Sequence, residues 1–249
     1  MIAVNTTGLT KVYGERSAVD SLDLCIQEGE FLALLGENGA GKTTTIKMLS
    51  CLIPPTRGDA LMMGESIITN PTTVKQHINI SPQETAIALH LTVRENLEMI
   101  AGIYGSTRQE AQSKAQSVLD SMGLRERADD RARTLSGGLQ RRLSIAMALI
   151  TEPRILFLDE PTIGLDVRAR HELWHAMQKL KGHVTVLLTT HYLEEAEALA
   201  DRIAVMHAGT LRALGTVAEL KQITGTASLE DAYLLLTDPQ QSLKVEARA

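Results

Sequence analysis

The side chains with the clearest chemical meaning follow one glycine-rich segment, which reads Gly36-Glu37-Asn38-Gly39-Ala40-Gly41-Lys42-Thr43. It fits the pattern G-x-x-x-x-G-K-[ST], in which glycines let backbone N–H groups wrap around phosphates. Lys42 can reach the β and γ phosphates of a nucleotide, and the Thr43 hydroxyl can ligate Mg²⁺. An apolar strand precedes the segment and a helix follows it, which disfavours a chance glycine-rich turn. The segment therefore predicts a nucleotide phosphate site.

Two carboxylates stand at the end of a second apolar run. Asp159 and Glu160 directly follow Ile155-Leu156-Phe157-Leu158, which is typical of a buried strand. Strand ends in such sheets face the ligand crevice. Asp159 is therefore placed to hold Mg²⁺, directly or through water, and Glu160 to polarise the attacking water as a general base. Alone, the pair would more often be an exposed strand end; with the phosphate loop it predicts a P-loop nucleotidase and nothing narrower.

A narrower interpretation comes from the segment Leu135-Ser136-Gly137-Gly138-Leu139-Gln140. Ser136 can cap the helix that follows, and the two glycines leave its first N–H groups free to bind an anion. An ordinary Ser-Gly-Gly helix start would look the same by itself. The segment resembles the LSGGQ signature of the ATP-binding-cassette (ABC) ATPases and, as in that family, lies shortly before the acidic strand. Leu139 stands where the family commonly has Gln. Because the resemblance assigns the phosphate contacts to the three preceding residues, we expect Leu139 to be tolerated.

Four more positions match the same family in order. The resemblance implies that Tyr13 stacks on adenine and that Gln83 senses Mg²⁺ and the nucleophilic water. It also implies that the loop Gly164-Leu165-Asp166 crosses a dimer interface and that His191 contacts the γ-phosphate. Each position alone has a structural alternative: core or hairpin packing for the tyrosine, and a plain loop, turn or strand end for the others. The shared order of the motifs over roughly residues 2–220 is far more specific than any one of them.

These motifs imply a full set of site residues, with ATP and Mg²⁺ as the ligands. By resemblance, the catalytic residues are Glu160, His191 and Gln83. The implied Mg²⁺ ligands are Thr43, Gln83 and Asp159. The implied ATP contacts are Tyr13, Gly36, Glu37, Asn38, Gly39, Ala40, Gly41, Lys42, Thr43, Thr44, Ser136, Gly137, Gly138 and Asp166.

Strand and helix patterns frame the phosphate loop. The segment Phe31-Leu32-Ala33-Leu34-Leu35 is continuously apolar, as expected of a strand covered on both faces. Lys42 to Leu52 has a helix pattern, which Pro54-Pro55 terminates. Upstream, Ser21 to Gln27 alternates polar and apolar residues and predicts a half-buried strand.

The middle of the chain, from about residue 84 to 150, has a mainly helical pattern. Capping-box sequences begin at Thr92 and Thr107, and Gly123 marks a helix end. We expect a helical insertion between two halves of a sheet. After it, Val184 to Leu188 is another buried-strand run, and a hairpin is expected around Ala208-Gly209. Strands that alternate with helices predict a mainly parallel sheet.

The predicted fold class is α/β. We expect a P-loop core with a mainly parallel sheet, an N-terminal antiparallel β subdomain and the inserted helical subdomain. The expected division is one ABC ATPase domain over residues 1–220, with the helical subdomain at about 84–150, and a helical tail over residues 221–249.

Composition sets outer limits on function. The chain has 249 residues, of which 44% are hydrophobic and 22% charged, as is ordinary for a soluble protein. The net charge of −5 disfavours a nucleic-acid partner. The N-terminus lacks a signal-peptide pattern, and no apolar run approaches the roughly 20 residues of a membrane span. Cys25 and Cys51 have no metal-ligand or redox spacing, so we expect reduced, buried thiols in a cytoplasmic protein.

The resemblance also implies partners. In the family, the phosphate loop of one domain and the signature of a facing domain close on the same ATP. We therefore expect a dimer with a second copy of this chain or with a paralogue. Family members meet membrane subunits through the helical region, so we expect a permease on a separate chain, which would hold this protein at the inner face of the cell membrane.

The C-terminal tail gives a weaker indication that transport is export. Ser228 to Thr237 is similar to the tail of ATPases from multidrug, antibiotic or ion exporters, although a generic amphipathic helix would look alike. Importers of this size often carry a longer C-terminal regulatory domain. This chain ends too soon for a large one, which also favours export. Two other classes stay open: an ABC ATPase of the translation or DNA-repair type, and a P-loop kinase. The kinase would leave the signature and His191 unexplained.

Overall fold

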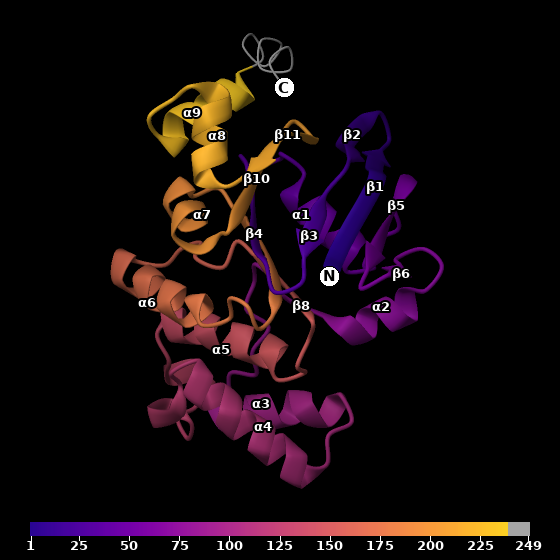
Figure 1. Ribbon diagram of the computed structural model, residues 1–249. Coiled ribbons are helices and arrows are strands. Elements are labelled where there is room, and N and C mark those ends of the chain that lie inside the picture. The colour runs from indigo at the N-terminus through magenta and orange to yellow at the C-terminus, as the bar shows by residue number, and fades with distance from the viewer. Residues whose placement is uncertain (239–249) are drawn as a thin grey trace.

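Two β-sheets and the helices around them make up residues 1–238, which are the residues that the computed structural model describes (Figure 1). The first sheet is antiparallel, with the order β2-β1-β5-β6 and with β3 also paired to β1. Its strands are β1 (Ile2–Tyr13), β2 (Arg16–Leu22), β3 (Cys25–Gln27), β5 (Arg57–Met62) and β6 (Glu65–Ser66).

The second sheet has the order β11-β10-β4-β9-β8-β7. Neighbouring strands in it are parallel except β10 and β11, which form the expected hairpin. Its strands are β4 (Phe31–Leu35), β7 (Ile78–Ser81), β8 (Ile155–Asp159), β9 (Thr185–Thr190), β10 (Arg202–His207) and β11 (Thr210–Gly215). The predicted α/β fold with a mainly parallel sheet and an antiparallel N-terminal sheet is confirmed.

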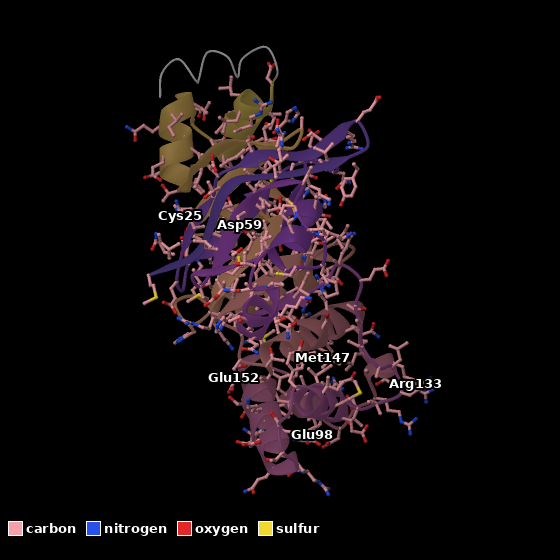
Figure 2. All side chains as sticks on the ribbon, turned by 90° about the vertical axis from the view of Figure 1, so that its right-hand side faces the viewer. Cys25, Asp59, Glu98, Arg133, Met147 and Glu152 are labelled. Atoms are coloured by element: carbon pink, nitrogen blue, oxygen red, sulfur yellow. The ribbon has the colours of Figure 1, made fainter. Side chains whose placement is uncertain are left out.

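The helices cover the parallel sheet and extend the molecule at both ends (Figure 1). Their bounds are α1 (Lys42–Leu49), α2 (Pro71–His77), α3 (Val93–Ile103), α4 (Arg108–Ser121), α5 (Gly137–Leu149), α6 (Val167–Gln178), α7 (Leu193–Leu199), α8 (Val217–Thr224) and α9 (Leu229–Thr237). Figure 2 shows Glu98 and Arg133 at the end formed by α3 and α4, whereas Cys25 and Asp59 lie on the antiparallel sheet.

The predicted domain division stays a prediction. Its boundary at residue 220 falls inside α8, and the polar end of the expected tail, residues 239–249, lies outside the described residues. Cys25 and Cys51 are free, and both are partly buried rather than fully buried as expected. Within residues 1–238, no helix combines the length and the apolar character that a membrane span requires.

Strand β4 shows how the layers are joined. Phe31, Ala33 and Leu35 pack into one core with the helices α3 to α7, whereas Leu32 and Leu34 pack into a second core with α1 and the antiparallel sheet. A strand buried on both faces needs apolar side chains at every position. The continuous apolar run therefore predicted this strand correctly, and the parallel sheet is the middle layer of three (Figure 1).

The helix starts in the middle of the chain follow their capping signals. Thr92 accepts a hydrogen bond from the Glu95 backbone N–H at 3.1 Å, and the Glu95 carboxylate accepts one from the Thr92 N–H at 2.7 Å. Thr107 and Glu110 form the same reciprocal pair. Both predicted capping boxes are thus confirmed, because they need only residues within one turn. Gly123 follows the end of α4 with a φ of 63°.

One predicted strand is wrong. The segment from Ser21 to Gln27 is not a single strand, because it is split between β2 and β3. Ser21 has a φ of 48°. The Thr6 hydroxyl, on β1, donates to the Leu22 carbonyl and accepts from the Leu24 N–H, each at 2.7 Å. Polar and apolar residues do alternate here. The segment is nevertheless divided into two strands, because β1 pairs with β2 on one side of the break and with β3 on the other.

A helix boundary also differs from the prediction. The helix expected from Lys42 to Leu52 ends at Leu49. Cys51 adopts a φ of 56°, and the Ile53 N–H donates to the Lys47 carbonyl at 3.2 Å. This turn satisfies the end of the helix before the proline pair is reached.

Glu195 is a carboxylic acid inside the helical layer. It lies on α7, is fully buried, and accepts a hydrogen bond from Trp174 Nε1 of α6 at 3.1 Å. Burial raises the pKa of the Glu195 carboxyl, against the lowering influence of the Thr190 hydroxyl, the Trp174 N–H and the Thr162 hydroxyl. Burial therefore makes the folded state favour the neutral carboxyl, although the Trp174 hydrogen bond by itself favours the charged one.

We expect Glu195→Gln to be more stable than the wild type at pH 8. A carboxyl whose pKa rises on folding stabilises the fold below its ordinary value of 4.5, and this contribution is lost as the pH rises through the raised value. Glutamine keeps the bond to Trp174 without titrating, whereas Glu195→Leu leaves that N–H unpaired and should cost about 1–3 kcal/mol. Urea unfolding from pH 5 to 8 tests this; a constant stability difference between wild type and Glu195→Gln would contradict it.

Candidate functional site

The site lies where four neighbouring parallel strands end. β4, β9, β8 and β7 run in the same direction, so their carboxyl ends meet at one edge of the sheet. Leu35, the last residue of β4, pairs with Thr190, and Asp159, the last residue of β8, pairs with Thr189. The phosphate loop, the acidic pair, Gln83 and the His191 segment follow these ends and therefore come together.

The phosphate loop closes around the Lys42 side chain. Lys42 Nζ donates to the carbonyl oxygens of Gly36 at 2.7 Å and Glu37 at 3.1 Å. Gly41, immediately before α1, has a φ of 105°, and a Cβ there would lie 2.5 Å from the Ala18 carbonyl oxygen. Glycine is therefore required at this position both by backbone conformation and by the close approach of β2.

Glu160 joins three segments of the chain. Its Oε1 lies 3.1 Å from Lys42 Nζ, and its Oε2 lies 2.5 Å from His191 Nδ1. Its own N–H donates to the Thr189 backbone oxygen and hydroxyl, each at 3.1 Å. The Lys42 and Glu160 side chains are only 5% and 7% exposed, so this pair is weakly screened by water. Both carboxylate oxygens are engaged, and an arriving phosphate would compete with Glu160 for Lys42.

Asp159 contacts the loop and the neighbouring strand. Its Oδ1 accepts from Thr43 Oγ1 at 3.2 Å and from Thr189 Oγ1 at 2.6 Å. One carboxylate and one hydroxyl fit Mg²⁺, which prefers oxygen ligands and usually completes its shell with water and phosphate oxygens. Residues 1–238 contain no cluster of three or more histidine, cysteine or acidic side chains that could hold a metal ion. Thr189 has no motif of its own, so the sequence did not reveal it.

A cavity of about 590 Å³ opens beside the phosphate loop. Among the predicted site residues it is lined by Tyr13, Asn38, Gly39, Gly41, Lys42, Thr43, Thr44, Gln83 and Glu160. Arg16, Ala18 and Ile163 also line it and were missed. Arg16 pairs with Tyr13 in the β1–β2 hairpin, so it lies beside the predicted tyrosine. Gly36, Glu37 and Ala40 belong to the loop without lining the cavity.

Tyr13 stands at the open side of this cavity. Its side chain is 50% exposed, which excludes the alternative that it serves as a core residue. Lys11 Nζ lies 5.3 Å from the centre of its ring. A flat, accessible aromatic ring beside a phosphate loop can stack on a nucleotide base.

The predicted signature residues lie apart from the cavity. Ser136 is exposed and caps α5 by accepting from the Leu139 N–H at 3.4 Å, as expected. Asp166 caps α6 in the same way, accepting from Ala169 N–H at 2.9 Å. None of the residues Ser136, Gly137, Gly138 and Asp166 lines the phosphate-loop cavity of the same chain.

Comparison with known proteins assigns this geometry to a family. The family model described as ABC transporter matches residues 19–163, which include the phosphate loop, Gln83, the start of α5 and the acidic pair. This chain belongs to the ABC transporter family. The daunorubicin/doxorubicin resistance ATP-binding protein DrrA of Streptomyces peucetius is 42% identical over 98% of this ABC chain and 73% of DrrA.

Solved ABC structures share the fold. The ATP binding subunit of an ABC transporter matches with a TM-score of 0.82 and 30% identity, over 95% of this chain and 100% of that chain. A dimeric ATP-binding cassette, bound to ADP and Pi in a post-hydrolysis state, matches with a TM-score of 0.75 and 28% identity. The match covers 86% of this chain and 98% of that cassette. This ABC chain is an ATP-binding, ATP-hydrolysing transporter subunit. None of these proteins is a kinase or a translation or repair factor.

The two signature glycines differ in their surroundings. A Cβ at Gly138 would lie 2.8 Å from the Ala169 Cβ of α6, whereas a Cβ at Gly137 would have no neighbour within 4 Å. The sequence suggested only that both glycines expose backbone N–H groups. Gly138 is also needed for the close packing of α5 on α6.

We therefore expect opposite effects on stability from two neighbouring substitutions. Gly138→Ala should destabilise the fold by about 1–3 kcal/mol, because the added methyl forces α5 and α6 apart. Gly137→Ala should be neutral or stabilising by up to about 1 kcal/mol, since alanine is the better helix former. Urea unfolding without nucleotide measures both, and equal losses in the two variants would rule out the packing explanation.

Proposed function

We propose that this ABC cassette works as a dimer and drives export through a membrane permease on a separate chain, at the inner face of the cell membrane. The observation that carries the dimer is the position of the α5 start. Ser136 and Gly137 are exposed and lie outside the ATP cavity of their own chain. A helix N-terminus with free N–H groups binds anions. The ATP held by a facing copy, or by a paralogue, supplies that anion.

The surface beside the α5 start supports the same arrangement. Ile163 and Val167 are 41% and 62% exposed, and they flank the loop that contains Asp166. Exposed apolar side chains beside a polar loop are typical of a contact surface. Two copies placed head to tail cover both surfaces and enclose two ATP molecules. The dimeric cassette among the similar structures supports this proposal.

Within each site, hydrolysis uses groups that already contact one another. Lys42 moves from Glu160 to the β and γ phosphates, which carry more negative charge than one carboxylate. One Glu160 oxygen is then free to accept a proton from the attacking water, while His191 holds the other oxygen and contacts the γ-phosphate. Gln83 orients that water. Thr43, Asp159 and Gln83 are the residues that would hold Mg²⁺, which when bound neutralises charge on the phosphates.

The remaining predicted contacts bind the nucleotide itself. Tyr13 stacks on adenine from the cavity edge. Backbone N–H groups of the phosphate loop and the hydroxyl groups of Thr43 and Thr44 bind phosphate oxygens. Ser136 and the N–H groups that follow it bind the γ-phosphate of the partner's ATP. When that phosphate leaves, the bridging charge is lost and the dimer loosens.

Glu160→Gln should separate ATP binding from ATP hydrolysis. Loss of a general base lowers the rate by about 10²–10⁴-fold, while the phosphate contacts persist. Mg-ATP should therefore trap a dimer of this variant, detected by size-exclusion chromatography with light scattering, whereas the protein without ATP is mainly monomeric.

Glu152→Gln is the matched control, because Glu152 is an exposed acid that pairs with Lys114 outside the site. We expect it to hydrolyse ATP like the wild type. A Glu160→Gln protein that stays monomeric with Mg-ATP at high concentration would argue against the dimer, and one that hydrolyses ATP normally would argue against the base.

Export is supported by the relative named above. DrrA is a resistance ATP-binding protein for daunorubicin and doxorubicin, and its similarity covers 98% of this chain. We transfer from it the direction of transport, not the cargo. The predicted tail segment contains α9. Ser228 caps this helix by accepting a hydrogen bond from the Asp231 N–H at 3.0 Å.

A small cavity beside α3 is the proposed contact with the permease. It has a volume of about 150 Å³ and lies between the end of β7, α3 and α5. Pro82 and Tyr104 line it, and Ile103, which precedes Tyr104 at the end of α3, is 70% exposed. Because Pro82 directly precedes Gln83, a permease segment seated here is one residue from the group that orients water. Closure at the nucleotide can thus be transmitted to the membrane subunit.

Ile103→Asp should weaken co-purification with the permease by at least about tenfold and abolish stimulation of ATP hydrolysis by the permease. A charge on an apolar contact must be desolvated, which opposes binding. Basal hydrolysis should not change, since Ile103 does not contact the nucleotide cavity. Ile68→Asp is the control, because Ile68 is 53% exposed on the antiparallel sheet side. Equal loss in both variants would exclude a specific docking face at α3.

A further inference from the structure

Two adjacent arginines on α5 have different surroundings. Arg142 is directed toward α6, where it pairs with Glu172 at 3.3 Å. Arg141 is only 4% exposed and takes part in none of the ion pairs found among residues 1–238. Burial of a charge without an opposite charge is unfavourable unless hydrogen bonds compensate. The buried Arg141 guanidinium must therefore be stabilised by hydrogen bonds.

The Arg141 guanidinium is held entirely by backbone carbonyl groups. Nε donates to the Pro161 oxygen and Nη2 to the Asp159 oxygen, each at 2.9 Å. Nη1 donates to the Pro82 oxygen and, at 3.2 Å, to the Gln83 oxygen. Burial lowers the pKa of Arg141 to about 10, so the group is still charged at neutral pH.

These carbonyls belong to the two segments that carry Gln83 and Glu160. Pro82 and Gln83 follow β7, while Asp159 and Pro161 are the residues on either side of Glu160. Glu160 has a φ of 47°, a left-handed conformation that is unfavourable for any residue with a Cβ. Such a conformation persists only where its surroundings hold it. Arg141 bonds to both flanks of this residue and to the facing segment at once.

From these contacts we propose that Arg141 is a positioning residue for ATP hydrolysis, which fixes the Gln83 segment and the Glu160 turn relative to each other. The proposal rests on the roles proposed above for Gln83 and Glu160. The planar guanidinium suits this task because its donors point in fixed directions toward several acceptors. Arg141 itself does not line the ATP cavity, so it acts through the two residues that do.

Arg141 also connects the start of α5 to the Gln83 and Glu160 segments. It lies about one helical turn after Gly137, so it moves with the helix start that faces the partner's ATP. In Figure 1, α5 lies between the parallel sheet and the α3–α4 pair, and it contacts both. A shift of α5 on dimer closure therefore changes the position of Gln83 and Glu160 in the same chain.

The test compares Arg141→Met with Arg142→Met in the full chain. Arg141→Met keeps most of the side-chain length but removes the donors. We expect its kcat for Mg-ATP to fall at least about tenfold, as for a small misplacement of reacting groups, with the KM for ATP within about threefold of wild type. Arg142→Met should have the kcat of the wild type. Circular dichroism and urea unfolding check that both are folded.

Arg141→Lys provides a second variant in case Arg141→Met does not fold. Lysine keeps the charge and the stem but has one nitrogen, which cannot reach all four carbonyls. Its kcat should fall with little change in KM. Amide hydrogen–deuterium exchange should also be faster at residues 83, 84, 160 and 162 than in Arg142→Met. A wild-type kcat in Arg141→Lys, or a change confined to KM, would overturn the proposal.

A double variant separates this proposal from the proposed function. Glu160→Gln combined with Arg141→Met should still form the ATP-trapped dimer, because Arg141 acts in hydrolysis and not in ATP binding. Failure of the double variant to dimerise, when Glu160→Gln alone does, would show that Arg141 has a general structural role and overturn the proposal. If Glu160→Gln alone hydrolyses ATP normally, the assignment of the base is wrong, and the Arg141 proposal falls with it.

Discussion

Parallel pairing of β4, β9 and β8 is the constraint on which the site depends. Because these strands run in one direction, every loop that follows them leaves the sheet at the same edge. Lys42, Glu160 and His191 come from the segments that follow these three strands, and they meet at the buried Glu160 carboxylate. Both faces of the sheet must be covered for the strands to be parallel and apolar, so the helical layer and the antiparallel sheet are required as well.

The buried polar groups near this edge show a common principle. Glu160 is held by Lys42 and His191, Asp159 by two hydroxyls, and Arg141 by carbonyls alone. None of these groups would be stable in an apolar core without its partners. A site built in this way has little freedom, which suits a reaction in which phosphate and water must be aligned closely. In the role proposed for Arg141, a movement of α5 would also reach Gln83 and Glu160.

The predicted site divides into two parts in space. Most of the phosphate loop, Tyr13, Gln83 and Glu160 line one cavity, whereas the start of α5 and Asp166 lie outside it. The sequence motifs could not show this separation, because motif order says nothing about which residues share a cavity. In the proposed dimer, this separation makes one copy of the chain an incomplete catalyst and couples hydrolysis to movement between subunits.

The sequence by itself determined the phosphate loop, the acidic pair, strand β4 and the capped starts of α3, α4 and α5. These features depend on residues that are neighbours in the chain, so local patterns carry them. Only the tertiary structure decided that Thr189 supports Asp159, that Arg16 and Ile163 line the cavity, and that Arg141 bonds to both flanks of Glu160. It also decided the break between β2 and β3. These contacts join residues far apart in sequence, and they follow from which strands pair and which helix covers them, which no local pattern specifies.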